Sequence, residues 1–421
     1  MRVTVVGLGY IGLPTSVILA SAGMNVYGYD VGEEHLNNIR QGRTGITEKG
    51  FSEKLKEVLD KGLLTLGNTL DGGSDVYLIV VSTSLDKEKN EMDIRALTEA
   101  SYDVGRVIKR GDLVIVESTV CVGTTEGIIK PILEKTSGLS CRKDFYLAFC
   151  PERVLPGDLI RELISNDRII GGVDRTSSEL AKGFYEKFVQ GKIYLTDART
   201  AEMAKLIENT YRAVNIALAN ELALIAEHTG VDVHEAIRLA NTHPRVHVHN
   251  PGPGVGGYCL TKDPWFLIQN FKGSRIIRDA MRINAEMPDH VIAITERGLK
   301  RLGKMLSTSR VCVLGLAYKG NISDPRESPG YEIYLRLKMM GADAVIHDPL
   351  VNEYMGYSPV KDVYEAVKGC DAVILATEHD CYLTLDWERI KKLMNPDPLV
   401  IDTKNMIRQP PGFYVKKLGA G

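Results

Sequence analysis

The sequence predicts an α/β protein with a Rossmann-like domain at each end and an all-α region between them. A glycine fingerprint directly follows the first apolar strand. A proline-free stretch with helical periodicity runs from about Thr200 to Gly230, and short apolar strands alternate with helices again from Arg310. The predicted domains cover residues 1–198, 199–303 and 304–421.

Length and composition are those of an ordinary globular chain. The 421 residues suffice for two or three domains, with 44% hydrophobic and 25% charged residues. A net charge of −2 gives no support for binding nucleic acid or an anionic membrane. No signal peptide or membrane span is evident. The seven cysteines are dispersed without metal-ligand spacing, which predicts reduced thiols, no metal site and a cytoplasmic location.

The N-terminal glycines stand in the context that a dinucleotide site requires. An apolar strand over residues 1–6 precedes them, and a helical pattern follows as far as Gly23. A second strand over Met24–Tyr29 ends in Asp30, whose carboxylate would accept hydrogen bonds from a ribose 2′-hydroxyl. The pattern therefore predicts nucleotide binding and favours NAD over NADP.

Each position of this motif has a physical role. Gly7 makes the tight turn, Gly9 lets a pyrophosphate approach, and Gly12 lets the helix pack against the strand. The backbone amides of Tyr10 and Ile11, at the helix start, would donate to phosphate oxygens.

Two further strands are predicted to place threonines beside the cofactor. These strands cover Asp75–Ser82 and Asp112–Ser118, with a helix over Ile94–Lys109 between them. Ligands of parallel sheets lie beyond the carboxyl ends of the strands, which is where Thr83 and Thr119 stand. Capping a helix or a turn is an equally good explanation for these two residues.

The loop after the next strand carries charged residues to the same edge of the sheet. A strand over Phe145–Phe149 leads into residues 150–157, CPERVLPG, called the rim loop below. It brings one carboxylate, Glu152, and one guanidinium, Arg153, to the predicted ligand side.

The long central helix carries a polar line formed by Lys205, Asn209 and Arg212, at positions i, i+4 and i+7. Such a line usually faces solvent. Here the flanking apolar residues Leu206, Ile207, Val214 and Ile216 are predicted to be buried on both sides. A polar line on a largely buried helix should face a polar cavity, because unpaired buried polar groups are costly. Further helices are predicted over 233–241, 263–269 and 274–302.

A glycine- and proline-rich loop, residues 250–265 (NPGPGVGGYCLTKDPW), follows the first of these helices, over 233–241. Glycine lets backbone approach a ligand closely. A helix that starts near Cys259 would place Lys262 and Asp263 on its first turn and favour the thiolate, the reactive form of cysteine. The competing interpretation is a turn with a buried, inert thiol.

The C-terminal part repeats the α/β architecture without a detectable sequence repeat. Strands are predicted over 311–314, 344–347, 372–376 and 399–402, with helices over 331–341 and 363–369. The first turn, Gly315 to Gly320, is glycine-rich but lacks the dinucleotide spacing. It suits a mononucleotide diphosphate, with Lys319 and Lys404 as charge partners.

Eight blocks of the chain, in this order, resemble the nucleotide-sugar 6-dehydrogenase family, with the layout of UDP-glucose dehydrogenase. They are GLGYIGLP, ESTVCVGTT, CPERVLPG, TAEMAKLIENTYRAVNIALANEL, HPRV, PGPGVGGYCLTKDPW, GLAYKGNISDPRESP and VIDTKN. The resemblance implies a NAD-binding Rossmann domain, a central region with a dimer-forming helix, and a C-terminal UDP-binding domain. It also implies a homodimer that serves polysaccharide biosynthesis by oxidising a sugar C6 alcohol to a carboxylate with NAD, a four-electron reaction.

Within the family, HPRV, TAEMAKLIEN and PGPGVGGYC resemble the branch that oxidises UDP-N-acetyl-D-mannosamine. UDP-glucose enzymes typically carry a second glutamate four residues after the first in the rim loop. Here the first is Glu152, and Pro156 stands at the second position, which argues against UDP-glucose. The UDP-N-acetylglucosamine branch shares a similar rim loop and glycine loop, so it is the closer alternative.

The resemblance also implies roles for individual residues. Cys259 corresponds to the nucleophile that holds the aldehyde as a thiohemiacetal and then a thioester. Lys205 corresponds to the proton donor and acceptor, Asn209 to a neutral hydrogen-bond donor, and Asp263 and Glu152 to carboxylates near the hydrolytic water.

Ligand contacts follow from the same matching positions. The implied substrate residues are Arg153, Val154, Lys205, Asn209, Arg212, His243, Arg245, Gly256, Tyr318, Lys319 and Lys404. Gly256 is expected to leave room for the sugar, and Arg245 is expected to reach the site of a neighbouring subunit. The implied cofactor residues are Gly7, Gly9, Tyr10, Ile11, Gly12, Asp30, Thr83, Thr119 and Arg326. Arg326 comes from the C-terminal half, so NAD is expected in a cleft between domains.

Two other functional classes fit this architecture. A non-catalytic sensor that binds NAD and a UDP-sugar would not need Lys205, Asn209, Cys259 and Asp263 together. A two-electron hydroxyacid dehydrogenase would not need Cys259, and it would release one NADH per substrate instead of two.

Overall fold

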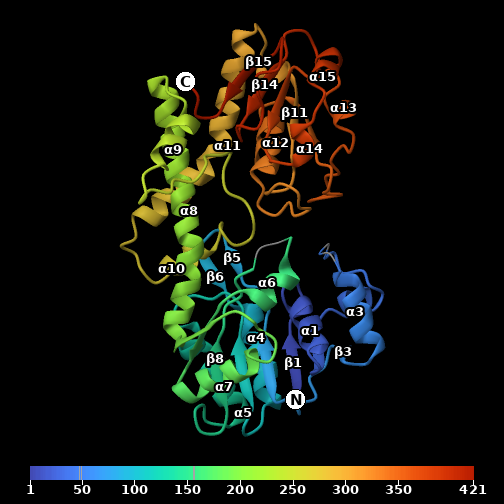
Figure 1. Ribbon diagram of the computed structural model, residues 1–421, viewed down its shortest axis with the longest axis vertical. Coiled ribbons are helices and arrows are strands. Elements are labelled where there is room, and N and C mark those ends of the chain that lie inside the picture. Colours follow the sequence, from blue (N-terminus) through green and yellow to red (C-terminus); the bar gives the residue numbers. More distant parts are fainter. Residues whose placement is uncertain (47, 49, 155–156) are drawn as a thin grey trace. The chain divides into compact units, whose positions relative to one another are not determined.

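The computed structural model in Figure 1 describes residues 1–46, 48, 50–154 and 157–421, so Leu155 and Pro156 of the rim loop lie outside the described residues. The chain separates into two compact units. Unit 1 contains Met1–Glu208 with Trp265–Asn270, and unit 2 contains Asn209–Pro264 with Phe271–Gly421. The division falls within the long helix α8 (Ala198–Thr229). The predicted α/β class, with parallel sheets and a helical middle region, is confirmed.

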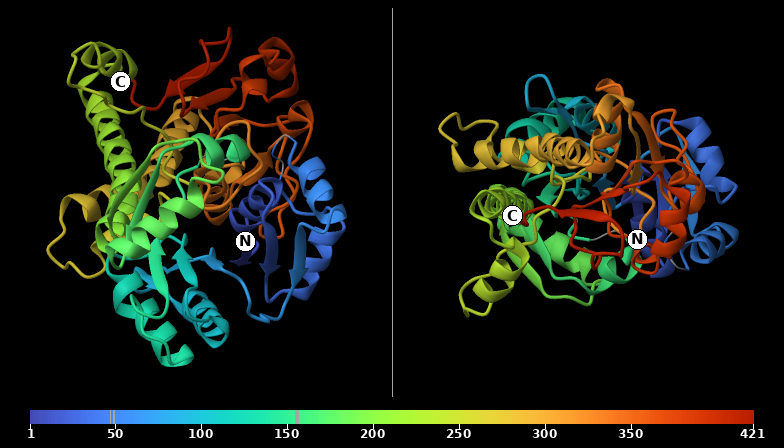
Figure 2. Two further views of the ribbon diagram at one scale, coloured as in Figure 1. Left: turned by 60° about the horizontal axis from the view of Figure 1, so that its bottom comes forward. Right: turned by 90° about the horizontal axis from the view of Figure 1, so that it is seen from above.

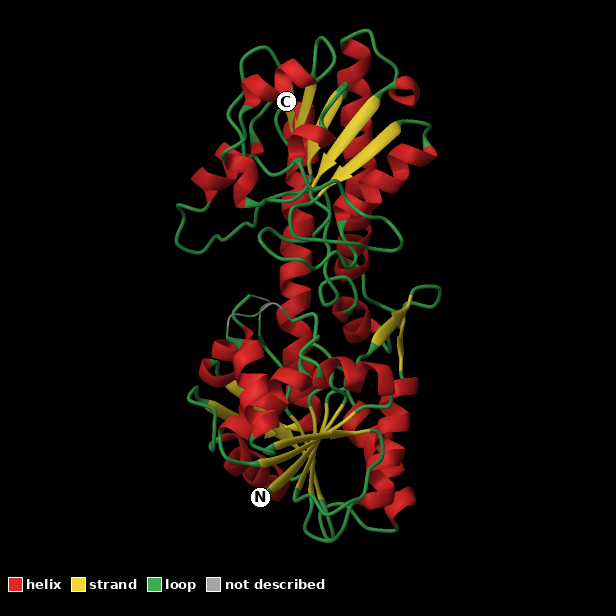
Figure 3. Cartoon of the chain, turned by 90° about the vertical axis from the view of Figure 1, so that its right-hand side faces the viewer, coloured by secondary structure: helices red, strands yellow, loops and turns green. Residues whose placement is uncertain are grey.

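Unit 1 is built on an eight-stranded sheet in the order β10-β9-β8-β7-β4-β1-β2-β3. The strands are β1 (Arg2–Val6), β2 (Asn25–Tyr29), β3 (Leu64–Gly67), β4 (Val76–Ile79), β7 (Leu113–Val116), β8 (Tyr146–Phe149), β9 (Arg168–Gly172) and β10 (Ile193–Asp197). All neighbours are parallel except β8 and β9. Figure 3 shows the twist of these strands with helices on both sides.

The helices of unit 1 connect these strands. They are α1 (Gly12–Ser21), α2 (Glu33–Arg40), α3 (Phe51–Asp60), α4 (Arg95–Val107), a π-helical turn (Thr125–Ile129), α5 (Lys130–Ser137), α6 (Leu159–Ser165) and α7 (Arg175–Tyr185). A two-stranded antiparallel hairpin, β5 (Ser84–Asp86) and β6 (Glu91–Asp93), was not predicted. Its short polar strands lack the apolar run on which strand prediction depends.

Both faces of the first sheet are covered, as a continuous apolar strand requires. Val76 and Leu78 of β4 belong to a core with α1 and α3, whereas Tyr77 and Ile79 belong to a core with α4 and α5. The alternation follows from the two-residue period of a strand. Burying each such side chain contributes roughly 1.5–3 kcal/mol, so the central strands form a rigid support for the loops that follow them.

Unit 2 contains a five-stranded parallel sheet in the order β12-β11-β13-β14-β15. Its strands are β11 (Arg310–Leu314), β12 (Asp343–His347), β13 (Ala372–Leu375), β14 (Leu399–Asp402) and β15 (Tyr414–Lys417). Its shorter helices are a 3₁₀ turn (Leu306–Thr308), α12 (Pro329–Met339), α13 (Val363–Ala366), α14 (Asp380–Leu383) and α15 (Trp387–Leu393). Strand β15 was not predicted, because its half-buried sequence YVKK has no apolar run.

The central helices are close to their predicted positions. They are α8, α9 (Val233–Ala240), α10 (Asp263–Ile268) and α11 (Ile276–Arg301). Helix α8, unbroken over 32 residues, can be followed in Figures 1 and 2. No helix among the described residues is both long and apolar enough to span a membrane.

Each of the two sheets contains the same kind of close crossing between its first strand and the following helix. Gly7 has a positive φ of 95°, and a Cβ on Gly12 would overlap the carbonyl oxygen of Gly7. Gly315 has a φ of 111°, and a Cβ on Gly330 would likewise overlap the carbonyl oxygen of Gly315. The second sheet therefore repeats the first turn, with a longer insertion between the two glycines.

Candidate active site

The turn between β1 and α1 has the geometry of a dinucleotide site. The amide of Leu8 donates to Asp30 Oδ2 and the amide of Gly32 donates to Asp30 Oδ1, each over 3.0 Å. Asp30 is thereby held at the end of β2, half-buried and beside the glycine turn. A Cβ on Gly9 would meet nothing within 4 Å. The backbone is open where a pyrophosphate would approach, so these residues fit NAD.

The corresponding carboxylate of the second sheet cannot play the same part. Asp348 follows β12 as Asp30 follows β2, but it is fully buried. Its oxygens accept hydrogen bonds of 2.8–2.9 Å from four backbone amides, those of Leu316, Ala317, Leu350 and Val351. Although burial opposes it, hydrogen bonds from His379 and the backbone lower the pKa of Asp348. A carboxylate engaged in this way supports the chain and is closed to a ribose, which agrees with the different ligand predicted here.

Thr83 and Thr119 lie together at the carboxyl ends of β4 and β7. The Thr83 hydroxyl donates to the Thr119 carbonyl over 2.7 Å, and Thr83 is buried while Thr119 is partly exposed. Thr83 therefore ties two loops together, a structural role that differs from the helix or turn capping considered in the sequence analysis. Tyr10, in the glycine turn, donates its hydroxyl to Glu48 over 3.2 Å. Glu48 also accepts the amide of Gly157 over 2.7 Å, which connects this turn with the rim loop.

The rim loop holds Glu152 and Arg153 by ion pairs that the sequence did not reveal. Glu152 accepts from the amide of Arg153 over 2.7 Å and from Arg168 Nη1 over 2.9 Å. Arg153 Nη2 lies 2.7 Å from Glu208 Oε1, one turn along α8 from Lys205. The partners Arg168 and Glu208 belong to no motif in the sequence, and each is distant in the chain from the residue with which it pairs. No sequence spacing therefore predicted these ion pairs.

Behind the rim loop lies a buried group of polar side chains. Tyr185 donates to Glu117 Oε1 over 2.5 Å, and the Arg168 guanidinium carbon lies 5.3 Å from the Tyr185 ring centroid. Burial raises the pKa of Glu117 to about 7, opposed by the charge of Arg168. Burial also raises the pKa of Cys150 to about 12, so this thiol is unreactive.

The predicted nucleophile, Cys259, is exposed, in contrast to Cys150. The helix start near Cys259 that was considered is not observed: α10 begins at Asp263, in agreement with its predicted bounds 263–269, and Cys259 lies in the preceding turn. The carbonyl of Cys259 accepts the amides of Lys262 over 3.2 Å and Asp263 over 2.9 Å, so the backbone closes this turn before the helix begins. A six-residue helix that starts four residues later is a weak source of thiolate stabilisation.

Cations near the turn supply the positive charge instead. Lys262 Nζ lies 4.0 Å from the Tyr258 ring centroid, and the Arg326 guanidinium carbon lies 5.3 Å from it. The hydrogen bond that Arg326 donates to Asp324 is the chief cause of its raised pKa, and the nearby Cys259 adds to the rise. The same interaction favours the thiolate of Cys259. Tyr258 was not among the predicted residues, although it adjoins Cys259.

The polar line on α8 is only partly as predicted. Lys205 and Asn209 are buried, with 8% and 7% of their surface exposed, whereas Arg212 is exposed. Asn209 Nδ2 donates to Asp263 Oδ2 over 2.7 Å, which joins two predicted catalytic residues. The expected burial on both flanks is wrong for Ile207, which is 48% exposed because it lies on the opposite face of α8.

Two loops of unit 2 that carry predicted substrate residues pack against each other. The amide of Gly257 donates to the Arg326 carbonyl over 3.0 Å. A Cβ on Gly256 would collide with Tyr318 and the Glu327 backbone. The expected reason for Gly256, room for the sugar, is therefore replaced by close packing of these loops. Lys404 pairs with Glu378 at 2.9 Å.

Of the other predicted substrate residues, three face solvent and one is half-buried. Lys319, His243 and Arg245 are exposed, and Val154 is half-buried. The loop that leads to Cys259 is anchored deeper: the amide of Gly252 donates to Asn220 Oδ1 over 2.9 Å, and Asn220 in turn donates to Asn284.

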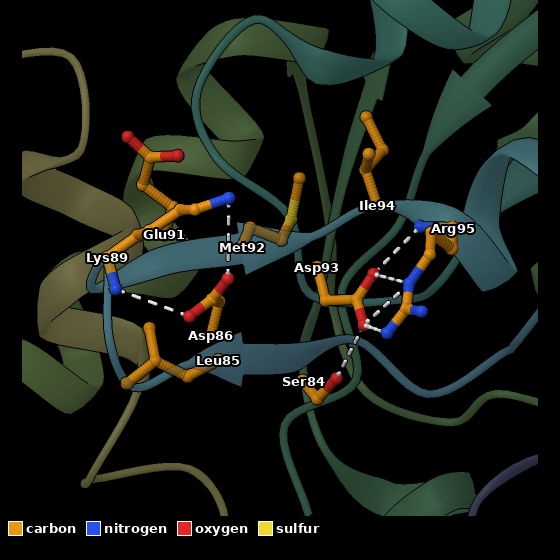
Figure 4. Close-up of a pocket in the computed structure, with 9 residues that line it drawn as sticks. All are labelled: Ser84, Leu85, Asp86, Lys89, Glu91, Met92, Asp93, Ile94 and Arg95. Atoms are coloured by element: carbon orange, nitrogen blue, oxygen red, sulfur yellow. Dashed lines mark hydrogen bonds and ion pairs between the residues drawn. The ribbon is translucent and has the colours of Figure 1, made fainter.

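A separate hollow of about 630 Å³ lies on the β5–β6 hairpin. Figure 4 shows its lining, in which Asp93 pairs with Arg95 at 2.7 Å and Asp86 with Lys89 at 3.8 Å. No predicted site residue contributes to this lining. In the described part of the chain, no group of three or more His, Cys, Asp or Glu side chains is arranged to hold a metal ion.

Comparison with known proteins gives matches along almost the entire chain. Models of the UDP-glucose/GDP-mannose dehydrogenase family match in three segments: the NAD binding domain over residues 1–189, the central domain over 199–286 and the UDP binding domain over 312–409. The chain is 44% identical to the UDP-N-acetyl-D-mannosamine dehydrogenase of Pyrococcus horikoshii, with 100% of both chains covered. It is 42% identical to the protein of that name from Methanocaldococcus jannaschii, covering 100% of this chain and 97% of the relative.

Solved structures agree with these sequence matches. The structure of the Pyrococcus horikoshii UDP-N-acetylmannosamine dehydrogenase has a TM-score of 0.94 to this chain over the full length of both. A UDP-N-acetylmannosamine dehydrogenase structure from Staphylococcus aureus, 39% identical, has a TM-score of 0.90 and covers 100% of this chain and 99% of that one.

The buried Glu117 predicts a pH dependence of stability. Its pKa of about 7 in the fold lies above the ordinary value of 4.5, so the native protein holds an additional proton between these values. The contribution of Glu117 to the free energy of unfolding is then fully present below about pH 4.5. It is lost as the pH rises to 7, by on the order of 3 kcal/mol. Glu117→Gln should abolish this fall in the free energy of unfolding, measured with urea from pH 4.5 to 8.

The slope with pH is the informative quantity, because a buried glutamine amide costs about 1–3 kcal/mol at every pH. Glu34→Gln, on the exposed surface of α2, controls for the loss of one carboxylate. An identical slope in Glu117→Gln and the wild type would contradict the prediction.

Proposed function

The chain belongs to the UDP-glucose/GDP-mannose dehydrogenase family, and we propose that it oxidises UDP-N-acetyl-D-mannosamine at C6 to the carboxylate in two successive NAD-dependent steps. The observation that carries this proposal is the full-length similarity to UDP-N-acetyl-D-mannosamine dehydrogenases. The local geometry agrees with such a reaction, because exposed Cys259 lies in the turn before Asp263, which binds Asn209.

The first oxidation converts the C6 alcohol to an aldehyde. NAD, bound to the domain of residues 1–189, supplies the hydride acceptor for both oxidations. The hydroxyl proton must leave as the hydride does, and Lys205 is the base in this proposal. Lys205 is buried on α8 one turn before Asn209, and Asn209 donates a neutral hydrogen bond near the developing oxyanion.

The second oxidation needs the aldehyde to be retained. The Cys259 thiolate adds to the aldehyde carbon, forming a C–S bond and an alkoxide that is protonated to the thiohemiacetal. Loss of that hydroxyl proton and of a second hydride gives the thioester. The positive charge of Arg326, close enough to interact with Cys259, favours the thiolate that begins this step.

Hydrolysis completes the four-electron oxidation. A water oxygen bonds to the thioester carbon, the C–S bond breaks, and its electron pair leaves with the Cys259 sulfur. The proton of the water passes to a carboxylate, for which Glu152 and Asp263 are the candidates. The product acid releases the second proton of the water to give the sugar carboxylate, and the thiolate is regenerated.

The UDP part of the substrate fits the basic residues of unit 2. Lys319 and Lys404 follow the first and fourth strands of the parallel sheet, in the order of the chain, and their ammonium groups suit a diphosphate. The family model for UDP binding covers both residues. Arg212, His243, Arg245 and Tyr318 complete the proposed substrate contacts.

A second candidate differs in the configuration of the sugar. The chain is 38% identical over 415 residues to the NDP-N-acetyl-D-galactosaminuronic acid dehydrogenase of Ralstonia solanacearum. Because of this similarity, the nucleotide forms of other N-acetylhexosamine epimers are alternative substrates. Pro156 in the rim loop argues against UDP-glucose.

We expect UDP-N-acetyl-D-mannosamine to be oxidised with two NADH formed per sugar. The panel should include the UDP forms of N-acetylglucosamine, N-acetylgalactosamine and glucose, with NADH counted by absorbance and the acid by mass spectrometry. An unmatched buried acetamido or hydroxyl group costs about 1–3 kcal/mol, so the mannosamine epimer should lead in kcat/KM by at least tenfold. A preference for another epimer would select the second candidate, and one NADH per sugar would contradict the four-electron reaction.

Replacing Cys259 by serine should stop acid formation without preventing binding. A hydroxyl is a much weaker nucleophile than a thiolate, so uronate formation should fall at least a hundredfold. Calorimetry should show nearly unchanged affinity for the UDP-sugar. Cys381→Ser, which changes the other exposed cysteine, is the matched control and should retain activity. Wild-type uronate formation in Cys259→Ser would show that the thiol is structural.

The exposed face of α8 supports a homodimer as part of this proposal. Met203, Ile207, Tyr211, Leu218 and Ile225 follow one another at intervals of four or seven residues, and each is 45–53% exposed. Side chains at these intervals share one face of a helix. A second copy of the same stripe would bury this apolar surface in a symmetric contact.

Charges placed in the stripe should dissociate the dimer. The double variant Leu218→Asp, Ile225→Asp should sediment as a single chain of 46.5 kDa, whereas the wild type should have twice that mass at micromolar concentration. Leu180→Asp changes a similarly exposed leucine on α7, outside the stripe, and should leave the mass unchanged. A monomeric wild type would refute the proposed dimer.

A further inference from the structure

The rim loop places Glu152 against a buried ionic group that the proposed reaction does not use. The group consists of Arg168 on β9, Tyr185 at the end of α7, Glu117 directly after β7, and the thiol of Cys150. These residues come from four separate segments of unit 1 and meet under the loop that also carries Arg153.

Contacts within the group hold the Glu152 carboxylate at both of its oxygens. Oε1 accepts the amide of Arg153 over 2.7 Å, and Oε2 accepts Arg168 Nη1 over 2.9 Å. Arg168 is 3% exposed, and its Nη2 donates to the Leu163 carbonyl over 3.0 Å. These contacts hold the guanidinium of Arg168 in place, so Arg168 sets the orientation of the Glu152 carboxylate.

The charges of the group do not balance when every carboxylate is ionised. Arg168 faces two carboxylates, Glu152 and Glu117, and interacts electrostatically with both. Glu117 Oε2 and Arg168 Nε have no hydrogen-bond partner among the described residues. Burying an uncompensated charge is costly, so protonation of Glu117 and the strength with which Arg168 holds Glu152 are linked.

We propose that Arg168 is the positioning residue for Glu152 in hydrolysis of the thioester, and that Glu117 controls how strongly Arg168 attracts the Glu152 carboxylate. This inference rests on the proposed function and selects Glu152 as the acceptor of the water proton. In that step the water oxygen bonds to the thioester carbon, the C–S electron pair returns to Cys259, and the proton moves to Glu152. Arg168 holds the Glu152 carboxylate in one orientation while the water attacks.

The ionisation of Glu117 should make the rate of the proposed hydrolysis depend on pH. The neighbours of Glu117 are Arg168, which favours its charge, Glu152, which opposes it, and the hydroxyl of Tyr185, with the Cys150 thiol beside them. When Glu117 ionises, near neutral pH, its negative charge competes with Glu152 for the Arg168 guanidinium, so the Glu152 carboxylate is held less tightly and is freer to accept a proton. The rate of hydrolysis should therefore rise several-fold as the pH increases through about 7.

The first test compares Arg168→Met with Arg168→Lys in the full-length enzyme. Both hydride transfers precede hydrolysis, so Arg168→Met should still release a burst of about two NADH per active site. Its steady-state kcat should then fall at least tenfold, and intact-mass measurement should show a sugar adduct on Cys259. The KM for UDP-N-acetyl-D-mannosamine should change less than threefold, and Arg168→Lys should recover part of kcat.

The second test uses Glu117→Gln, which leaves Arg168 and Glu152 in place. The several-fold rise of kcat between pH 6 and 8 should disappear in this variant, while its KM stays near the wild-type value. If Arg168→Met fails to fold, judged by circular dichroism, this pH profile together with Arg168→Lys decides the question.

Each outcome separates the inference from the proposed function. A wild-type enzyme that oxidises none of the UDP-sugars refutes the proposed function itself. An active wild type with an equally active Arg168→Met refutes the inference alone. A raised KM without an adduct on Cys259 also refutes it, because Arg168 would then only anchor the rim loop and its neighbour Arg153.

Discussion

The contact between Gly12 and the Gly7 carbonyl is the constraint on which the arrangement of functional residues depends. Any side chain at Gly12 would overlap that oxygen, so only glycine lets α1 cross β1 this closely. The crossing points the start of α1 at the carboxyl edge of the sheet, where Asp30, Thr83 and the rim loop also lie. Gly315 and Gly330 repeat the contact in unit 2, with a longer loop that carries Tyr318, Lys319 and Arg326.

A Rossmann-like crossing does not by itself decide which ligand is bound. The two carboxylates that follow the second strand of each sheet illustrate this point. Asp30 is half-buried and accepts two amides, so it can still meet a ribose, whereas Asp348 is fully buried under four amides and His379. One architecture is therefore used twice, once with an accessible carboxylate and once with a supporting one.

Several charged groups among and beside the predicted site residues are held by partners. Glu152 is fixed by Arg168, Arg153 by Glu208, Asp263 by Asn209, and Arg326 by Asp324. Such pairing limits the number of orientations that each group samples, which is what general acid–base chemistry requires. It also means that the pKa of a buried member, as at Glu117, depends on the charge of the whole group.

The sequence by itself determined the fold class, the glycine turn with Asp30, the central helix and the identity of Cys259 as an unusual cysteine. These features follow from local periodicity and from residue types at short spacing, which a chain expresses before it folds. Only the tertiary structure decided that Ile207 is exposed and that Gly256 packs closely against Tyr318. It alone also revealed Arg168, Glu208 and Tyr258, because their partners are distant in sequence or their role depends on cations brought together by packing, and no local pattern encodes such contacts.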